Sequence, residues 1–211
     1  MNPFWLILKQ TVMLAFRKGG GALGCMAFYV IAVTLFTFAL GPEATRGSAG
    51  AVLCVALLLS AITVLPLFYE RDHEDGTLEQ LLLYPMLLEL LVLAKLLGQW
   101  VSCILPMLLV SPLLAMSAGL SGEQMAQALW PLLLASPTVL ALGSIAAALT
   151  LDTRRGGLLQ ALVVMPLYVP VLIFAASGAQ TGAQLILAAM LCAALPLSCY
   201  LSAALIRISQ E

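Results

Sequence analysis

Residues 48–69 read SAGAVLCVALLLSAITVLPLFY, a stretch of 22 residues without a charged side chain. The hydrocarbon core of a bilayer is about 30 Å thick, and a helix of about 20 apolar residues crosses it. The continuous apolar run Ala56-Leu57-Leu58-Leu59 lacks the alternation of a membrane barrel strand. Backbone polar groups in lipid must be satisfied internally, so the stretch is predicted to be a membrane-spanning helix.

Similar apolar stretches lie on either side of this one. We expect six spans, at about residues 22–41, 48–69, 90–119, 126–150, 158–177 and 184–205. The third span contains one charged residue, Lys95, and is too short to form two spans. Since the six spans use most of the 211 residues, we predict an all-α membrane protein that forms a single transmembrane domain over residues 1–211.

The composition excludes several classes of protein. Hydrophobic residues make up 63% of the chain and charged residues only 9%, whereas a soluble domain has about 25% charged residues. So few charges cannot cover the surface of a soluble enzyme of this size. The same scarcity argues against a disordered chain and against a basic nucleic-acid-binding protein.

Cysteine and histidine usage argues against several kinds of chemistry. All the cysteines lie in predicted spans and none forms a C-x-x-C pair, so we interpret them as small apolar residues. They are Cys25, Cys54, Cys103, Cys192 and Cys199. The single histidine, His73, lies outside the spans, and the chain has no phosphate-binding G-x-x-x-x-G-K-[ST] motif. We therefore expect no catalytic residue, no metal site and no cofactor held by this chain.

The Lys and Arg residues predict the orientation, because cytoplasmic loops collect basic residues. One side carries eight of the nine basic residues, counting Lys95 just beyond the segment 70–89, and the other side carries only Arg46. The eight are Lys9, Arg17, Lys18, Arg71, Lys95, Arg154, Arg155 and Arg207. Both termini are therefore expected on the cytoplasmic side.

Residues 3–18 are loosely amphipathic and precede the first span. One side carries Trp5, Leu8, Val12, Ala15 and Phe16, and the other carries Gln10, Arg17 and Lys18. This pattern predicts a helix lying in the membrane interface, with an extension of the first span as the alternative. The glycines at 19–21 are expected to form the joint between the two helices.

The most polar segment lies between the second and third spans and reads ERDHEDGTLEQLLLYP, residues 70–85. Asp75-Gly76 predicts a turn, and Thr77 with Gln80 forms a capping box that predicts a short helix from Leu78. One face of that helix would carry Leu78, Leu81 and Leu82. Two interpretations stay open: a helix whose leucines rest on lipid, or a docking element for a cytoplasmic partner.

The same segment resembles the signature of the CcmB family, the permease subunits of an ABC-type complex for haem delivery in cytochrome c maturation. The resemblance rests on Leu67-Phe68, Asp72 and the block Asp75-Gly76-Thr77-Leu78-Glu79-Gln80-Leu81. Weaker matches include Gly41-Pro42, Leu93-Ala94-Lys95, Ser136-Pro137-Thr138 and Arg155-Gly156-Gly157. Together they extend over about residues 4–209.

This resemblance implies a non-catalytic permease of the ABC exporter type in the bacterial inner membrane, paired with a second copy. It implies two copies of a cytoplasmic ATPase, CcmA, which bind the ATP. Further implied partners are CcmC, CcmD and the haem chaperone CcmE, with haem held by a partner subunit. The expected function is to couple ATP hydrolysis to movement in the membrane and to release of the haem-loaded chaperone. A non-translocating scaffold for the ATPase, or a lipid or drug exporter permease, is the alternative.

By the same analogy, residues 70–85 become a coupling helix that contacts the ATPase. The candidate coupling residues are Asp72, Glu74, Asp75, Gly76, Thr77, Leu78, Glu79, Gln80, Leu81 and Leu82. The leucines could fill an apolar groove, and the acids could pair with basic residues of the ATPase. Arg154 and Arg155 are candidates for a second cytoplasmic contact, or they serve orientation alone.

Lys95 is the one charged residue well inside a predicted span. We expect its side chain to extend to the cytoplasmic interface, with pairing to Glu89 or to a neighbouring subunit as the alternatives. Gln99 lies one helical turn further on, and Ser102 follows it. Lys95, Gln99 and Ser102 could therefore form a polar seam between subunits.

Overall fold

The computed structural model describes residues 3–17, 21–74, 76, 87–151, 156–178 and 180–209. Every regular element within these ranges is a helix. The segments long and apolar enough to cross a membrane are Gly21–Gly41, Gly47–Leu67, Leu88–Ser117, Gly122–Leu149, Leu158–Ala176 and Thr181–Ile208. The six predicted spans are thereby confirmed, each bound falling within four residues of its predicted position.

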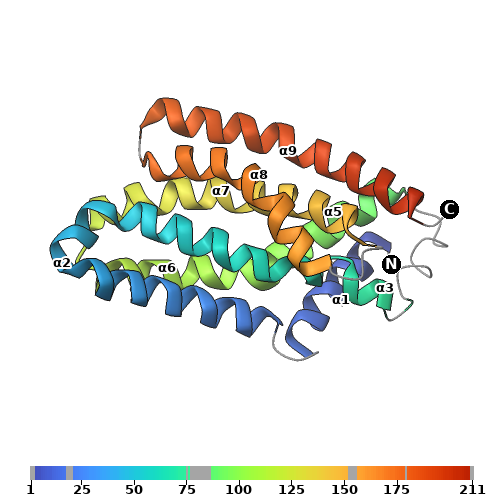
Figure 1. Cartoon of the computed structure of the whole chain (residues 1–211), viewed down its shortest axis with the longest axis horizontal. Coiled ribbons are helices and arrows are strands. Elements are labelled where there is room, and N and C mark those ends of the chain that lie inside the picture. The colour runs from blue at the N-terminus through green and yellow to red at the C-terminus, as the bar shows by residue number, and fades with distance from the viewer. Residues whose placement is uncertain are drawn as a thin grey trace.

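The helices form one elongated bundle (Figure 1). In chain order they are α1 (Pro3–Arg17), α2 (Gly21–Val64), the 3-10 turn η1 (Leu65–Leu67), α3 (Glu70–Glu74), α5 (Leu88–Gln99), the π-helical turn η2 (Trp100–Ile104), α6 (Leu105–Ser117), α7 (Gly122–Leu149), α8 (Gly156–Ala176) and α9 (Thr181–Ile208). The N-terminus, the C-terminus, α1 and α3 lie at the same end of the bundle (Figure 1). We call this the terminal end.

A bend at Gly41 joins the first two spans, which both belong to α2. Gly41 has φ 76° and ψ 166°, a conformation that glycine adopts at little cost. The Thr45 hydroxyl donates to the carbonyl of Gly41 at 2.6 Å and lies 3.4 Å from the carbonyl of Thr37. The Thr45 side chain thereby connects the second arm of α2 to the last turn of the first arm.

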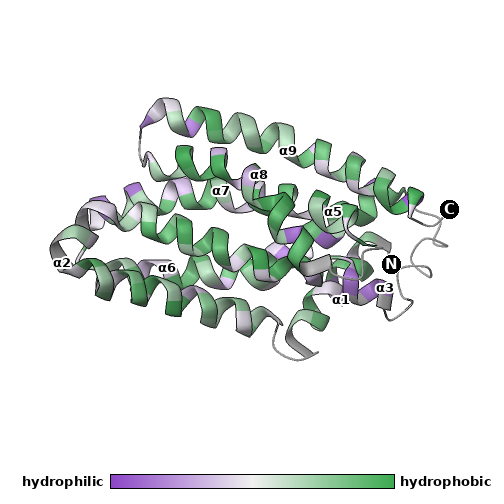
Figure 2. Ribbon diagram, viewed as in Figure 1, coloured by the Kyte–Doolittle hydropathy of each residue, from purple (hydrophilic) through white to green (hydrophobic). Residues whose placement is uncertain are grey.

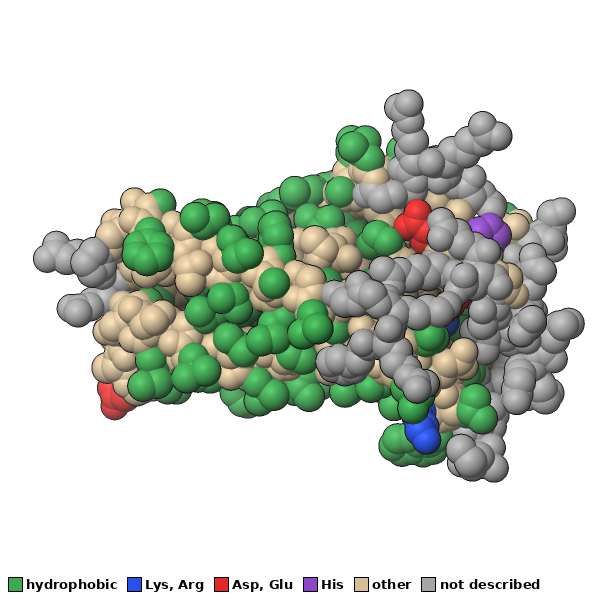
Figure 3. All heavy atoms as spheres, turned by 90° about the horizontal axis from the view of Figure 1, so that it is seen from below, with side chains coloured by type: hydrophobic (Ala, Val, Ile, Leu, Met, Phe, Trp, Pro, Cys, Tyr) green, Lys and Arg blue, Asp and Glu red, His purple; other side chains and the backbone are tan. Residues whose placement is uncertain are grey.

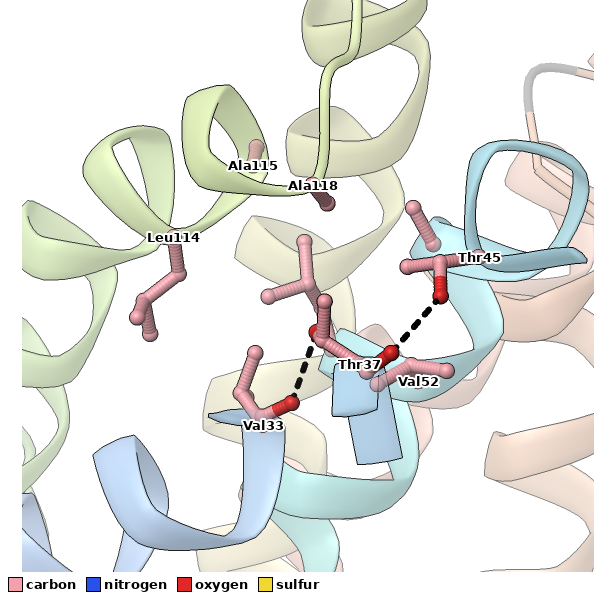
Figure 4. Close-up of a pocket in the computed structure, with 9 residues that line it drawn as sticks. Val33, Thr37, Thr45, Val52, Leu114, Ala115 and Ala118 are labelled. Carbon is pink, nitrogen blue, oxygen red and sulfur yellow. Dashed lines mark hydrogen bonds between the residues drawn. The ribbon is translucent and has the colours of Figure 1, made fainter. Parts of the chain in front are cut away.

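Beside the bend, a small void lies between α2 and the end of α6 (Figure 4). Its lining includes Val33, Thr37 and Val52 from the two arms of α2, and Leu114 from α6. The threonine hydroxyls bond to backbone carbonyls, so the lining of the void is apolar. It has room for no more than about one water molecule and is too small to be a ligand site.

The third span changes helix type part-way along. Pro106 has no N–H and cannot donate to the carbonyl four residues before it, at Ser102. The π-helical turn η2 covers this position and restores the helix as α6. Within η2, the indole N–H of Trp100 donates to the hydroxyl of Ser136 on α7 at 3.2 Å.

The core of the bundle is centred on α7, which packs against α2, α6, α8 and α9. Leu132, Val139 and Leu140 on α7 are fully buried. Most serine and threonine hydroxyls in the core bond to the preceding turn of their own helix or to a neighbouring helix. The hydroxyls of Tyr29 on α2 and Ser111 on α6, for example, lie 2.7 Å apart.

The outer surface is apolar along most of the bundle. Phe38 is 85% exposed and Leu158 is 74% exposed. In Figure 2 most of the ribbon has the hydrophobic colour, and the hydrophilic colour is strongest near the ends of the bundle. Figure 3 shows hydrophobic side chains along the length of one face of the molecule. A water-soluble monomer rarely exposes so large an apolar surface, so the chain is a multi-pass membrane protein.

The N-terminal helix α1 is confirmed, but the face that it packs against the bundle differs from the predicted one. Ile7 and Ala15 are buried, whereas Trp5, expected on the same side as Ala15, is 63% exposed. This face packs closely because Thr11 lies against Gly98 of α5, which has no side chain. A Cβ on Gly98 would come within 2.8 Å of the Thr11 Cβ. Of the predicted glycine joint at 19–21, Gly21 begins α2 and the other two glycines lie outside the described residues. The interfacial placement of α1 stays a prediction.

Candidate functional site at the terminal end of the bundle

The connection after the second span enters the protein interior before it reaches the surface. The 3-10 turn begins at Leu65, and Pro66 is its second residue. The turn closes where the N–H of Phe68 donates to the carbonyl of Leu65 at 3.1 Å. Leu65, Phe68 and Tyr69 are all 1% exposed or less. Connecting segments usually run over the surface, so this buried stretch is a plug at the terminal end of the bundle.

A single helical turn, α3, follows the plug and carries Glu70 and Asp72 in its first turn. Carboxylates there interact favourably with the unpaired N–H groups of a helix start. The N–H of His73 donates to the carbonyl of Tyr69 at 2.9 Å, and the N–H of Gly76 donates to the carbonyl of His73 at 3.1 Å. Gly76 has φ +67°, as the predicted Asp75-Gly76 turn requires.

Lys95 points into this plug from α5. Its side chain forms an ion pair with Asp72, and its ammonium donates to the carbonyl of Phe68 at 3.1 Å. The same nitrogen lies 5.1 Å from the centre of the Tyr69 ring, within range of a cation–π interaction. Lys95 is only 3% exposed, so the expected extension of its side chain to the interface was wrong.

The pair is asymmetric in its exposure: the Lys95 side chain is 4% exposed and the Asp72 side chain 22%. Removing one partner of a buried pair typically costs about 3–5 kcal/mol, because the remaining charge has no partner. Lys95 would be the stranded charge after loss of Asp72, whereas Asp72 alone still reaches water. Loss of Asp72 should therefore be the more damaging of the two changes.

Tyr69 extends the site to two further helices. Its hydroxyl is buried, with the hydroxyls of Ser202 on α9 and Ser144 on α7 beside it and 3.5 Å from each other. Burial raises the pKa of the Tyr69 hydroxyl well above its usual range, although the neighbouring Ser202 hydroxyl opposes this rise. Tyr69 is therefore a neutral group at physiological pH, and its ring, not a phenolate, faces the Lys95 ammonium.

Glu89, the alternative partner considered for Lys95, pairs elsewhere. Its carboxylate lies 3.5 Å from the guanidinium of Arg207 on α9, and the Arg207 side chain is 59% exposed. An exposed pair of this kind contributes about 0–1 kcal/mol. It joins the start of α5 to the end of α9 at the same terminal end, and it offers a comparison for the buried pair.

The remaining predicted site residues are placed as follows. Gln99 is 2% exposed, with its side-chain oxygen 4.0 Å from the Cys103 sulfur, and Ser102 is fully buried. Lys95, Gln99 and Ser102 are thus covered by this chain, and a seam with another subunit stays a prediction. Glu74 ends α3. Residues outside the described ranges are Asp75, Thr77, Leu78, Glu79, Gln80, Leu81, Leu82, Arg154 and Arg155.

Comparison with known proteins identifies the family. The model of the CcmB protein family matches residues 2–209 of the chain. The chain belongs to the CcmB family. Heme exporter protein B of Haemophilus influenzae is 37% identical over an alignment of 218 positions, which covers 99% of each chain. The protein of the same name from Pseudomonas aeruginosa is 39% identical, over 87% of this chain and 83% of its own. That from Escherichia coli K12 is 37% identical over 98% of both.

Both residues of the buried pair were singled out from the sequence, but their pairing was not predicted. Asp72 and Lys95 both belong to stretches that match the CcmB signature, yet they are 23 residues apart. A usable signal was the combination of a lysine well inside a span with a carboxylate at the start of the preceding polar segment. An intramembrane charge needs a partner, and the adjoining segment is a nearby source of one.

Proposed function

We propose that this CcmB-family chain is the non-catalytic permease subunit of an ABC-type haem exporter that acts in cytochrome c maturation. The observation that carries the proposal is the match to the CcmB model over almost the whole chain, together with relatives named Heme exporter protein B. Six membrane crossings agree with a permease. These 211 residues carry no phosphate-binding G-x-x-x-x-G-K-[ST] motif, so ATP hydrolysis is assigned to a partner.

The proposed complex lies in the bacterial inner membrane. Its other members are two copies of the ATPase CcmA, a second copy of this chain, CcmC, CcmD and the haem chaperone CcmE. The terminal end of the bundle faces the cytoplasm in this proposal, because the basic residues gather in the termini and in the loops predicted on that side. Haem is held by a partner, since this chain has a single histidine, His73.

The coupling role is assigned to residues 70–85. Acidic side chains in this segment offer charge complementarity to a basic ATPase surface, which sets register and association rate more than affinity. Its leucines offer an apolar contact. Movement of the ATPase would displace this segment, and the displacement would drive release of the haem-loaded chaperone.

The test is Leu78→Asp in the complete complex, with Leu87→Asp as the matched control. Leu87 is 66% exposed and precedes α5 at its N-cap, where aspartate is well tolerated. We expect Leu78→Asp to leave ATP hydrolysis in place and to lower the yield of mature cytochrome c by about tenfold or more, and Leu87→Asp to change neither.

The experiment has three readouts: co-purification of the ATPase, its rate of ATP hydrolysis and the yield of mature cytochrome c. Maturation that continues at the wild-type level in Leu78→Asp, with the ATPase still bound, would refute the coupling role. A scaffold without a translocation role would lose maturation only in parallel with loss of ATPase binding.

A further inference from the structure

The terminal end contains a junction at which one short stretch of chain, residues 68–72, contacts three helices. Phe68 and Asp72 bind Lys95 on α5. Tyr69 lies under the Lys95 ammonium, and its hydroxyl lies beside Ser144 on α7 and Ser202 on α9. Asp72 is also only three residues before Asp75, which opens the sequence-predicted turn that precedes the proposed coupling leucines.

We propose that the Lys95–Asp72 ion pair is the link that carries movement of the coupling segment into the membrane spans. Asp72 and Lys95 are positioning residues in this proposal: they contact neither haem nor ATP. The inference rests on the proposed coupling role of residues 70–85, and it names the contact through which that role is exerted.

Lys95 has no alternative partner among the described residues. Each contact of its ammonium comes from residues 68–72: the Phe68 carbonyl, the Tyr69 ring and the Asp72 carboxylate. The side chain is buried, so it cannot exchange Asp72 for water without movement of the plug. Charge attraction is strong in such a low-dielectric site, so a displacement of α3 is transmitted to α5 and not absorbed by side-chain rotation.

The neighbouring Glu89–Arg207 pair lacks these properties. Its nitrogen–oxygen separation is 3.5 Å, and Arg207 is more than half exposed, so either partner can turn to water. This pair joins the same end of α5 to α9 but does not include the segment 68–74. It is therefore a matched control for removal of an ion pair at this end of the bundle.

Tyr69 spreads the movement beyond α5. The ring is fully buried, and the serines beside its hydroxyl, Ser144 and Ser202, are fully buried as well. A shift of residues 68–72 that pulls on Lys95 must also move this ring against α7 and α9. The junction therefore connects the coupling segment with the third, fourth and sixth spans at once.

The test removes the charge of the pair while keeping the fold. Lys95→Met leaves only Asp72, which is partly exposed and can be hydrated. The double variant Asp72→Leu/Lys95→Met removes both charges, an exchange that buried pairs often tolerate. Glu89→Gln/Arg207→Gln is the control. Each variant is expressed in the complete complex, with thermal unfolding, ATPase co-purification, ATP hydrolysis and cytochrome c maturation as readouts.

We expect the first two variants to fold, to bind the ATPase and to retain hydrolysis, but to lower maturation per ATP hydrolysed by about tenfold. Lys95→Arg keeps the charge and should recover part of the loss. The control should stay near the wild-type ratio. A folded Lys95→Met or double variant with a wild-type ratio would overturn the proposal. Failure of both to fold would assign the pair a structural role and would overturn it equally.

Leu78→Asp, measured in parallel, separates this inference from the proposed function. If Leu78→Asp lowers the ratio and the Lys95 variants do not, the coupling segment acts through another contact and only the inference fails. If Leu78→Asp keeps the wild-type ratio, the proposed coupling role itself fails.

Discussion

Gly143→Ala should destabilise the protein at the point where the plug meets α7 and α8. A Cβ at Gly143 would lie 2.6 Å from the Cδ2 of Leu65 and 2.8 Å from the hydroxyl oxygen of Tyr168. Ordinary contacts of a Cβ begin at 3.4 Å, so the added methyl group falls short by 0.8 Å and 0.6 Å. Either the helices separate or both side chains move.

Burial limits how far those side chains can move. Leu65 is 0% exposed and Tyr168 is 3% exposed, so neither has open space to enter. Overpacking of this kind costs about 1–3 kcal/mol. Against it stands the gain from replacing a glycine inside a helix with alanine, about 1 kcal/mol.

Gly24→Ala isolates the steric part. Gly24 lies in the first span, and a Cβ there meets no atom of the described residues within 4 Å, so this variant reports the helical gain alone. We expect Gly143→Ala to melt lower than Gly24→Ala by about 2–12 °C in thermal unfolding of the detergent-solubilised protein, using 2–4 °C per kcal/mol. Tyr168→Phe should recover part of the difference, because it removes the hydroxyl that the new Cβ would meet. That hydroxyl has no hydrogen-bond partner among the described residues, so its removal breaks no bond there.

Equal melting temperatures for Gly143→Ala and Gly24→Ala would refute this reasoning. Such a result would mean that the plug yields to a methyl group at no cost. A double variant Gly143→Ala/Tyr168→Phe no more stable than Gly143→Ala would remove the Tyr168 hydroxyl from the explanation and leave Leu65 as the residue that resists.

Two further predictions concern glycines elsewhere in the bundle. Gly41→Ala places a side chain at φ +76°, which costs about 1–2 kcal/mol although the new Cβ meets no described atom within 4 Å. Gly47 has equally open surroundings among the described residues but lies in the helix, so Gly47→Ala should be neutral or stabilising in the same thermal unfolding experiment. Gly98→Ala brings a Cβ within 2.8 Å of the Thr11 Cβ, so about 1–3 kcal/mol of destabilisation is expected. The measurement is thermal unfolding of Gly98→Ala and of the wild-type protein, each with α1 present and with α1 deleted. Without α1, the two should unfold alike.

The spans could be predicted from the sequence because the bilayer imposes a length and an apolar composition on each of them. The bend between the first two spans could not be located in this way. The charged Arg46 between two apolar stretches predicts a loop there, whereas the backbone is helical on both sides of Gly41. Hydropathy identifies where a chain leaves lipid, but it does not distinguish a loop from a bent helix outside the lipid.

The packed face of α1 was missed for a related reason. The amphipathic pattern assigns apolar residues to one side of a helix and polar residues to the other. It therefore places the large apolar Trp5 on the same side as Ala15. In a bilayer, large apolar side chains gain little from contact with protein over contact with lipid, so close packing of small residues decides the interface. Gly98 and Thr11 form such a contact, and Trp5 lies on the exposed surface.

The depth of Lys95 explains why its partner had to come from the plug. Lys95 is seven residues into a 30-residue span, about 10 Å from the start of a helix about 45 Å long. A bilayer core about 30 Å thick leaves about 15 Å of that helix outside, so Lys95 lies near the interface, where its side chain could have reached water.

The buried Phe68 and Tyr69 close that route, and Asp72 supplies the counter-charge through the plug. Because Asp72 stays 22% exposed, its hydration limits the energy needed to separate the pair, while the burial of Lys95 limits how far the separation can go. The charges of an ion pair deep in the core would be too costly to separate. Those of a fully solvated pair would separate so easily that the pair would transmit no movement. A link that must transmit repeated movement needs a strength between these extremes, and the plug sets that strength through the unequal exposure of its two charges.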